Sequence, residues 1–273
     1  MDARSPTITG SYRFARFSKS AEELARLKLQ ATVAIDRERD AWRVAGLQPG
    51  MRVLDLGCGP GFTSCELARA VGPAGQVTGI DASPDLIAVA EQAKESEQVA
   101  NVAFARGDVY ALDLPADQFD FVHARFLFQH LRDPGLALRN AWRVLKPGGA
   151  LCILDIDDDW TSFAPASAAF ARFVRRAGVA QRGQGGNRRI GSQLHGLLSA
   201  AGFQQVAVRI QPLTTADLGL RNFLGVAVLF RLEVLTKFQK LLAMPLLRKI
   251  KAAAGDPHAW GAVGIFVARG AKP

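Results

Sequence analysis

A turn of three glycines preceded by an acid is the clearest chemical feature of this 273-residue sequence. Gly57, Gly59 and Gly61 are spaced G-x-G-x-G, and Asp55 stands two residues before the first of them. Glycines let the backbone approach a bound molecule where any Cβ would collide. A carboxylate at the entrance of this turn would repel a pyrophosphate and attract a cation. A ligand that carries an amino group and a sulfonium, with no phosphate, therefore fits this turn better than a dinucleotide.

The elements that must position this turn follow from the hydrophobic pattern, in which short apolar runs alternate with helical stretches. The predicted strands are Arg52–Leu56, Val77–Asp81, Val102–Arg106, Phe119–His123, Ala150–Ile156, Gln205–Ile210 and Ala262–Arg269. The helices predicted around the early strands are Ser20 to about Ala45, Phe62–Val71, Pro84–Lys94 and Gly135–Leu145. This alternation is typical of a parallel sheet covered on both faces. Right-handed crossovers then predict a doubly wound α/β sheet.

Five segments in this order resemble the motifs of class I S-adenosylmethionine-dependent methyltransferases. They are VLDLGCGPG from residue 53, GIDAS from 79, ARGDVYAL from 105, FDFVHARFLFQHL from 119 and LKPGGALCILD from 145. The segment that begins at Gln181 resembles the ubiquinone/menaquinone-methyltransferase-like superfamily of small-molecule enzymes. The resemblance implies a Rossmann-like, seven-stranded, mostly parallel sheet with helical lid insertions. It also implies S-adenosylmethionine as cofactor and S-adenosylhomocysteine as product.

The same resemblance implies cofactor-binding roles for individual residues. Asp81, with Ala82 beside it, would hold the ribose, because a carboxylate can accept hydrogen bonds from both hydroxyls. Asp108 would bind the adenine, although a helix N-cap is an alternative role for it. The other implied cofactor-binding residues are Asp55, Gly57, Cys58, Gly59 and Gly61 in the turn, Gly107 and Val109 beside Asp108, and Ala124, Arg125 and Phe126 facing the sulfonium.

Two histidines are candidate catalytic residues. A general base is needed if the methyl acceptor is a phenol, a hydroxyl or a carbon acid, whereas an amine or a carboxylate needs none. His130 is the first candidate and His123, at the end of the fourth predicted strand, is the second. A packed histidine near a helix end is the alternative for His130.

Candidate substrate contacts lie outside these motifs. Arg188 and Arg189 are candidates for binding an anionic group, because arginine binds carboxylate or phosphate through a planar fork; a solvated helix face with a basic loop is the alternative. Tyr12 and Phe14 are candidates for closing over the site, with a packing role as the alternative. The acids at 155, 157, 158 and 159 could ligate Mg²⁺, but the further acid and amide that such sites need are not identifiable, so we expect no metal. Helix N-capping is predicted instead, with Asp157 reaching the substrate.

The domain division follows from where the alternation stops. Residues 1–45 are predicted as an N-terminal helical cap and 46–273 as the methyltransferase domain, with lid segments at about 158–195 and 217–254. Trp160–Val179 is predicted to be helical, and Leu218–Ala254 to be helical with a break near Pro245. The second stretch is apolar nearly all round, so it must be buried or face something apolar. A lid, a homodimer contact and a membrane-surface element are the three interpretations of it.

Composition excludes several classes of protein. Hydrophobic residues make up 49% of the chain, which excludes wholesale disorder. There is no apolar run of 18 residues and no leader-like segment, so we expect no transmembrane span. Three cysteines without metal-ligand spacing suit a reducing, cytoplasmic location. Residues 1–156 carry a net charge of −1 and residues 157–273 a net charge of +10, so the basic excess lies in the C-terminal part.

The sequence thus predicts a methyltransferase for a small, partly hydrophobic acceptor, with an anionic group as an option, in secondary or quinone/isoprenoid metabolism. A nucleic-acid methyltransferase is an alternative that the basic C-terminal part permits. The sequence argues against a nucleic-acid substrate or partner. HARF stands after the fourth predicted strand in place of the N/D-P-P-Y/F motif, and no RNA-binding module is recognisable. A cyclase-like enzyme that binds the cofactor without transferring methyl is the other alternative. A nicotinamide oxidoreductase is disfavoured by Phe62 and Asp55.

Overall fold

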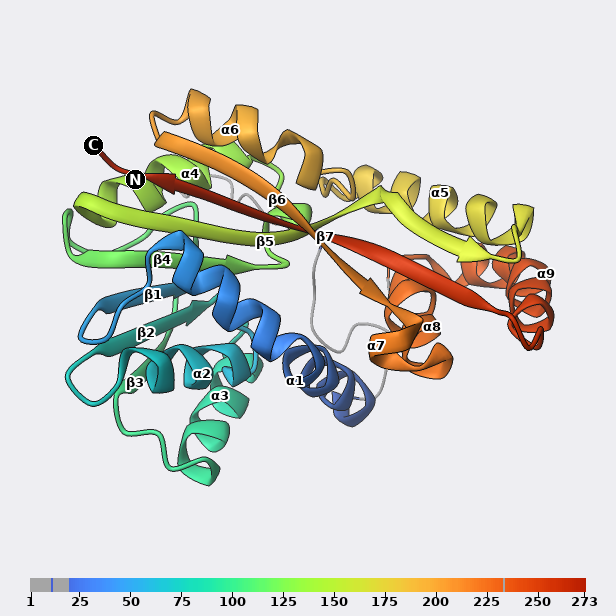
Figure 1. The fold of residues 1–273 in the computed structure, drawn as a ribbon, viewed down its shortest axis with the longest axis horizontal. Helices are drawn as coiled ribbons and strands as arrows, with labels where there is room; N and C mark the ends of the chain where they lie inside the picture. Colours follow the sequence, from blue (N-terminus) through green and yellow to red (C-terminus); the bar gives the residue numbers. More distant parts are fainter. Residues whose placement is uncertain (1–10, 12–19, 233) are drawn as a thin grey trace, which may run out of the picture.

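Seven strands form one sheet in the computed structural model, which describes residues 11, 20–232 and 234–273 (Figure 1). The strand order is β3-β2-β1-β4-β5-β7-β6. The strands are β1 (Arg52–Leu56), β2 (Gln76–Asp81), β3 (Val102–Arg106), β4 (Phe119–Arg125), β5 (Leu145–Ala164), β6 (Gln204–Thr214) and β7 (Trp260–Ala271). Strands β1 to β5 run parallel, and β7 is antiparallel to both β5 and β6. The predicted doubly wound, mostly parallel sheet is confirmed.

Helices cover both faces of this sheet. The α-helices are α1 (Ser20–Ala45), α2 (Phe62–Val71), α3 (Pro84–Ser96), α4 (Pro134–Val144), α5 (Ala168–Gly183), α6 (Leu194–Ala200), α7 (Thr215–Leu218), α8 (Leu220–Ala227) and α9 (Lys237–Ala253). The 3₁₀ turns are η1 (Phe128–His130), η2 (Gly191–Gln193) and η3 (Leu229–Leu232). No helix in the described ranges is both long and apolar enough to cross a bilayer.

Alternation of side chains along the strands divides the core between the two faces. Val53 of β1 packs with residues of α1 and α2, such as Trp42 and Leu67. Its neighbour Leu54 points to the other face and packs with residues of α4 and α6, such as Leu138. Successive residues of a strand face opposite sides, so an apolar run such as RVLDL serves both layers.

The starts of α3 and α4 are fixed by local chemistry. Ser83 caps α3, since its hydroxyl accepts a hydrogen bond from the backbone N–H of Leu86, and Pro84 occupies the first turn. Asp133 and Pro134 do the same for α4, where Asp133 accepts from Leu136. Because β2 and β4 both run parallel to β1, their carboxyl ends lie at the same edge of the sheet.

A long two-stranded arm distinguishes this chain from a minimal doubly wound sheet. β5 is 20 residues long and pairs with β7 out to Ala164, past a register shift between Ile156 and Thr161. Figure 1 shows the ends of β5 and β7 running away from β1–β3 and carrying α5 and α7–α9. A separate apolar cluster, which includes Phe173 and Phe223, holds these helices to the arm.

Three sequence predictions in this arm were wrong. The segment from Trp160 was predicted to be helical, but it continues β5, and α5 begins only at Ala168 because backbone pairing with β7 extends to Ala164. Asp157 and its acidic neighbours were predicted as helix caps, but they lie inside β5. The predicted helix break near Pro245 was also wrong, since Pro245 lies within α9. The helical segment is interrupted instead between α8 and α9.

The N-terminal helix does not stand apart from the sheet. α1 packs against α2, α8, β5 and β7, so it bridges the sheet and the arm. The division into a cap at residues 1–45 and a domain at 46–273 stays a prediction, as do the two lid segments. Tyr12 and Phe14 lie outside the described residues.

Candidate functional site

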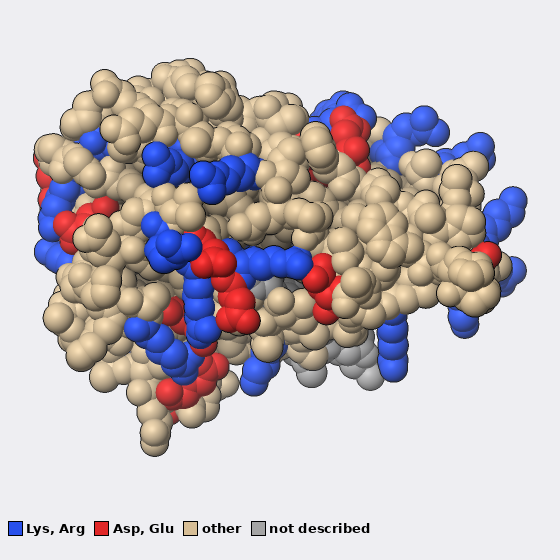
Figure 2. Space-filling view, in the orientation of Figure 1, with Lys and Arg blue, Asp and Glu red and all other residues tan. Residues whose placement is uncertain are grey.

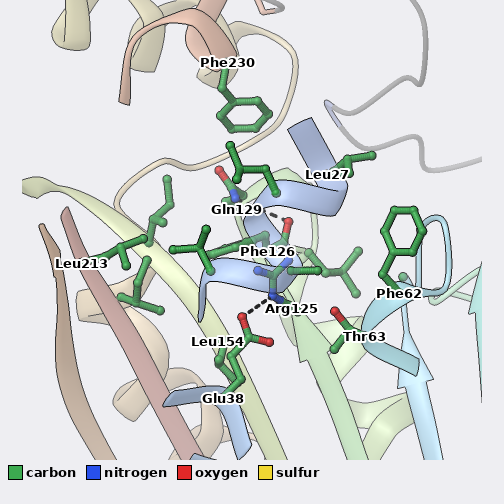
Figure 3. A pocket seen from close by; sticks show the side chains of 18 of the residues that line it. Leu27, Glu38, Phe62, Thr63, Arg125, Phe126, Gln129, Leu154, Leu213 and Phe230 are labelled. Atoms are coloured by element: carbon green, nitrogen blue, oxygen red, sulfur yellow. Dashed lines mark hydrogen bonds and ion pairs between the residues drawn. The ribbon is translucent and has the colours of Figure 1, made fainter. Parts of the chain in front are cut away.

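A cavity of about 180 Å³ lies at the carboxyl ends of β1, β2 and β4 and continues toward the arm. Open α/β sheets bind their ligands at this edge. Its walls come from the glycine turn, from α1, from the strand ends, and from residues of β6, β7, α7 and η3. In Figure 3, Phe230, Leu213 and Phe62 surround the space from three different sides.

The glycine turn needs glycine for different reasons at its successive positions. Gly59 has a φ of 56°, and a Cβ there would meet no atom within 4 Å, so this position leaves space at the cavity wall. Gly61 has a φ of 76°, and a Cβ there would lie 2.6 Å from the ring of Phe104 and 2.8 Å from the Cβ of Ala90. Gly61 therefore serves the packing of the turn against β3 and α3, and it does not line the cavity.

Asp55 lines the cavity and is held from behind by two side chains. Its Oδ2 accepts a hydrogen bond from the Ser64 hydroxyl at 2.6 Å, and its Oδ1 lies 2.8 Å from Nδ1 of His123. His123 is fully buried, packs edge-on to Trp42 and does not line the cavity. The structure therefore places this candidate base behind Asp55, where it positions the carboxylate.

Asp81 joins the end of β2 to the glycine turn. Its carboxylate accepts from the backbone N–H of Gly59 at 3.0 Å and from that of Ser83 at 2.8 Å. Burial, together with the nearby charge of Asp55, raises its pKa although the backbone hydrogen bonds lower it. Asp81 and Cys58 both line the cavity, and burial raises the pKa of the Cys58 thiol well above its usual value.

The predicted adenine contacts lie near this edge but not on the cavity wall. Gly107 donates its N–H to the carbonyl of Asp81 at 3.0 Å. Asp108 accepts from the backbone N–H of Tyr110 at 2.9 Å, and Val109 packs on the core. Ala82, like these three residues, does not line the cavity.

At the exit of β4 a buried ion pair connects the strand to α1. Nε of Arg125 lies 2.7 Å from Oε1 of Glu38, as Figure 3 shows, and the guanidinium lies 4.5 Å from the centre of the Phe126 ring. Phe126 has a φ of 51°, which is rare for a residue with a side chain and is often retained at functional sites. Arg125 and Phe126 line the cavity, whereas Ala124 is buried within the sheet.

A hydrogen-bonded chain fixes the state of His130, which lines the cavity. Gln181 donates through Nε2 to the carbonyl of Gln129 at 2.9 Å, while its Oε1 accepts from Arg188 at 3.3 Å. This orientation brings Nε2 of Gln181 to 3.3 Å from Nδ1 of His130, so Nδ1 acts as an acceptor. Ser11 Oγ lies 3.0 Å from the same nitrogen. A neutral His130 then carries its proton on Nε2.

Two buried arginines share one carboxylate at the far side of the cavity. Asp158, in the extended part of β5, pairs with Nε of Arg188 at 2.9 Å and with Nη2 of Arg231 at 2.7 Å. Burial raises the pKa of Asp158, but the two arginines outweigh this and the net shift is downward. Burial lowers the pKa of Arg231 to about 10. Both arginines line the cavity, so this wall carries an excess of positive charge.

The remaining predicted substrate residues lie off the cavity. Arg189 forms an exposed ion pair with Asp159 at 2.8 Å. Asp157 is buried and accepts from the backbone N–H groups of Asp159 and Ser192. Within the described chain, no group of three potential ligand side chains is arranged to hold a metal ion.

Many cavity residues escaped the sequence analysis, among them Glu38, Gln129, Phe230 and Arg231. Glu38 reaches Arg125 across 87 positions in the chain, and no local pattern announces such a pair. Arg231 did leave a signal, because a cation in the apolar run VAVLFRL must find a partner if the run is buried.

A methyltransferase-domain family profile matches residues 47–182, which is about half of the chain. The demethylmenaquinone methyltransferase of Geobacillus sp. is 34% identical over 116 residues, covering 42% of this chain and 50% of that protein. This chain belongs to the class I S-adenosylmethionine-dependent methyltransferase family. The matched range contains the glycine turn, Asp81 and the exit of β4.

A second curated protein and a solved structure are also similar to this chain. An uncharacterised 37.1 kDa protein of a Streptomyces fradiae transposon is 38% identical over 163 residues, covering 57% of this chain and 44% of that protein. The chain thus spans about half the length, or less, of these curated relatives. The structure of the [4+2]-cyclase SpnF matches with a TM-score of 0.57 and 23% identity, covering 87% of this chain and 81% of SpnF, which is a likeness of fold.

Proposed function

We propose that this protein transfers a methyl group from S-adenosylmethionine to a small, partly hydrophobic acceptor that carries an anionic group. The observation that carries the proposal is the continuity of the cavity. It joins the acidic end at Asp55 and Asp81 to an apolar wall and to the arginine pair Arg188 and Arg231. The two ends of this cavity therefore offer sites of opposite charge.

The acidic end fits the cofactor. The carboxylates of Asp55 and Asp81 are held by a hydroxyl, a histidine and backbone N–H groups rather than by lysine or arginine. Their negative charge is therefore available to an ammonium and a sulfonium. In this proposal Asp55 holds the amino end, Asp81 takes the ribose, and Arg125 and Phe126 border the sulfonium. When bound, the cofactor supplies an electrophilic methyl group.

The opposite end fits an acceptor with an apolar body. Phe126, Leu213, Val263 and Phe230 line this part of the cavity, and burying apolar surface against them would exclude water. Arg188 would bind the anionic group through Nη2, since its Nε pairs with Asp158 and its Nη1 donates to two glutamines. His130 would donate a hydrogen bond from Nε2 to the acceptor.

Positioning is the main catalytic contribution in this proposal. Holding two reactants in a productive geometry converts a bimolecular step into a unimolecular one. The tautomer with the proton on Nε2, which these contacts favour, argues against His130 as a base toward the cavity, and His123 does not reach the cavity. An amine acceptor needs no base and leaves a separate anionic group to pair with Arg188, so it fits these observations best.

Titration calorimetry with S-adenosylmethionine, S-adenosylhomocysteine and NADH tests the cofactor. We expect both sulfur compounds to bind and NADH not to bind. If neither sulfur compound binds, the proposed function is wrong.

Acceptor preference is tested by release of S-adenosylhomocysteine with apolar amines that carry a carboxylic acid and with the corresponding neutral amides. We expect Arg188→Gln to raise KM for the acids and to leave KM for the amides unchanged. Cofactor binding together with conversion of an added compound, but without S-adenosylhomocysteine release, would instead support a cyclase-like reaction.

A further inference from the structure

Two helices of the arm together form a basic and apolar surface that the cavity does not use. α5 and α9 pack against each other at the end of the molecule away from β1–β3 (Figure 1). We call their outward surface the α5–α9 face. It is defined by the exposed apolar residues Val179, Phe238, Leu241 and Leu242 and by the exposed cations Arg172, Arg175, Arg176, Lys237, Arg248 and Lys249. Figure 2 shows lysine and arginine side chains gathered at this end of the molecule.

An apolar stripe runs along the exposed side of α9. Phe238, Leu241 and Leu242 are 69%, 67% and 49% exposed, and Pro245 continues the same stripe. Their spacing of i, i+3, i+4 and i+7 places them on one side of the helix. Ala243 and Ile250 of the same helix are buried against the arm, so the exposed stripe is not the side that packs on it.

A cationic stripe with the same spacing lies beside it on α5. Arg172, Arg175, Arg176 and Val179 repeat at i, i+3, i+4 and i+7, and all four are exposed. Nη1 of Arg176 donates to the carbonyl of Leu242 at 3.3 Å, which joins this stripe to the apolar stripe of α9.

Neither helix contains an acidic residue. The exposed cations of the two helices are Arg172, Arg175, Arg176, Arg182, Lys237, Arg248, Lys249 and Lys251. Among the described residues, none of these eight forms an ion pair with an acidic side chain. The surface of these two helices is therefore positively charged, and its cations are not neutralised by acidic side chains. Such a surface is suited to an anionic partner.

We propose that the α5–α9 face docks the protein on the surface of an anionic phospholipid membrane. Interfacial helices of this kind insert an apolar side into the boundary of the acyl chains while their cations meet the lipid phosphates. A second copy of this chain fits less well, because a symmetric contact would bring the same cations face to face. Nucleic acid would engage the cations and leave the apolar stripe in water.

Co-sedimentation of the full chain with vesicles tests the proposal. One vesicle is phosphatidylcholine alone and the other is two parts phosphatidylcholine to one part phosphatidylglycerol. We expect at least about tenfold stronger binding to the anionic vesicle, weakening as salt screens the charges.

Two variants separate the two parts of the face. Phe238→Ser with Leu241→Ser removes the apolar stripe, and Lys237→Glu with Arg248→Glu and Lys249→Glu reverses part of the charge. Both should lose at least about tenfold in binding to the anionic vesicle. The matched control, Arg43→Glu with Arg52→Glu and Arg139→Glu, changes the net charge equally at exposed positions on other elements and should lose much less. Circular dichroism verifies that each variant is folded.

Four results would overturn the proposal. Equal binding to neutral and anionic vesicles is one, and vesicle binding unchanged in both variants is another. The third is a wild-type dimer in analytical ultracentrifugation that becomes a monomer in the serine variant, together with no binding of wild type to vesicles. This result would assign the face to a second copy of the chain. RNA binding that needs the cations but not the apolar stripe, again without vesicle binding, would contradict it equally.

Discussion

The aspartate side chains of this protein have different roles because their neighbours differ. Asp81 meets backbone N–H groups and lines the cavity, Asp158 neutralises part of two guanidiniums, and Asp155 is fully buried in β5. Burial penalises the charged form of each, and the local donors decide how much of the penalty is recovered. The sequence shows three aspartates at strand ends, but only their surroundings distinguish them.

Asp81→Ala tests the ribose assignment. We expect S-adenosylmethionine to bind about 1–3 kcal/mol more weakly, because the variant loses the acceptor for two hydroxyls. Calorimetric titration measures this affinity. Asp85→Ala, an exposed aspartate in the first turn of α3, is the matched control and should bind as wild type does. Wild-type affinity in Asp81→Ala would refute the assignment.

His130→Ala distinguishes a donor from a general base. A donor that orients the acceptor should raise KM about tenfold and leave kcat within a few-fold, since a neutral hydrogen bond contributes about 0.5–1.5 kcal/mol. Loss of a base would lower kcat by about 10²–10⁴ and remove a limb of the pH profile. Steady-state kinetics against pH with the preferred acceptor decides between them, and a collapse of kcat would contradict the donor role.

At the scale of elements, α1 closes the site through a pair that joins distant segments. Glu38 and Arg125 are both largely buried and lie 2.7 Å apart, so α1 is held to the exit of β4 next to the cavity. The arm contributes in a similar way, because Asp158 of β5 holds Arg231 of η3 against the cavity. Two elements that carry cavity residues, α1 and η3, are thus tied by charge to neighbouring strands.

Glu38→Ala should destabilise the fold by about 3 kcal/mol, because it removes the carboxylate that pairs with the largely buried guanidinium of Arg125. Urea unfolding followed by circular dichroism measures the free energy of unfolding. Asp36→Ala, on the same helix but fully exposed in its pair with Arg39, should change it by less than about 1 kcal/mol. An equal decrease in the free energy of unfolding in the two variants would show that the buried pair stabilises the fold no more than the exposed pair does.

At the scale of the whole molecule, the sheet and the arm contribute different kinds of residue to the cavity. The sheet supplies the acidic half of the cavity and the arm supplies an apolar wall and the arginines. The basic excess of residues 157–273 belongs to the arm and to the strands beside it, and α5 and α9 present much of it outward. Negative charge at the cavity therefore lies on the sheet, whereas the positive excess lies on the arm and the strands beside it.

Stability should fall as the pH rises from about 4 to about 7. Burial raises the pKa of Asp155 to about 7, from near 4 in an unfolded chain, although backbone hydrogen bonds oppose the shift. Between these values the folded state binds the proton that the unfolded state has released, so deprotonation favours unfolding. Urea unfolding across this range should show the decline in wild type, and a smaller one in Asp155→Asn. Identical slopes in the two proteins would mean that Asp155 is not responsible.

The sequence by itself determined the sheet and the glycine turn. Apolar runs of strand length and the caps of α3 and α4 are local signals, so β1 and β3 begin and end where the sequence predicts. Tertiary structure alone decided the arm, because Trp160–Ala164 becomes a strand only through pairing with β7, a hundred residues later in the chain. It also decided which groups meet: His123 with Asp55, Glu38 with Arg125, and Asp158 with two arginines. Contacts of this kind depend on how distant segments pack, and no short-range pattern encodes them.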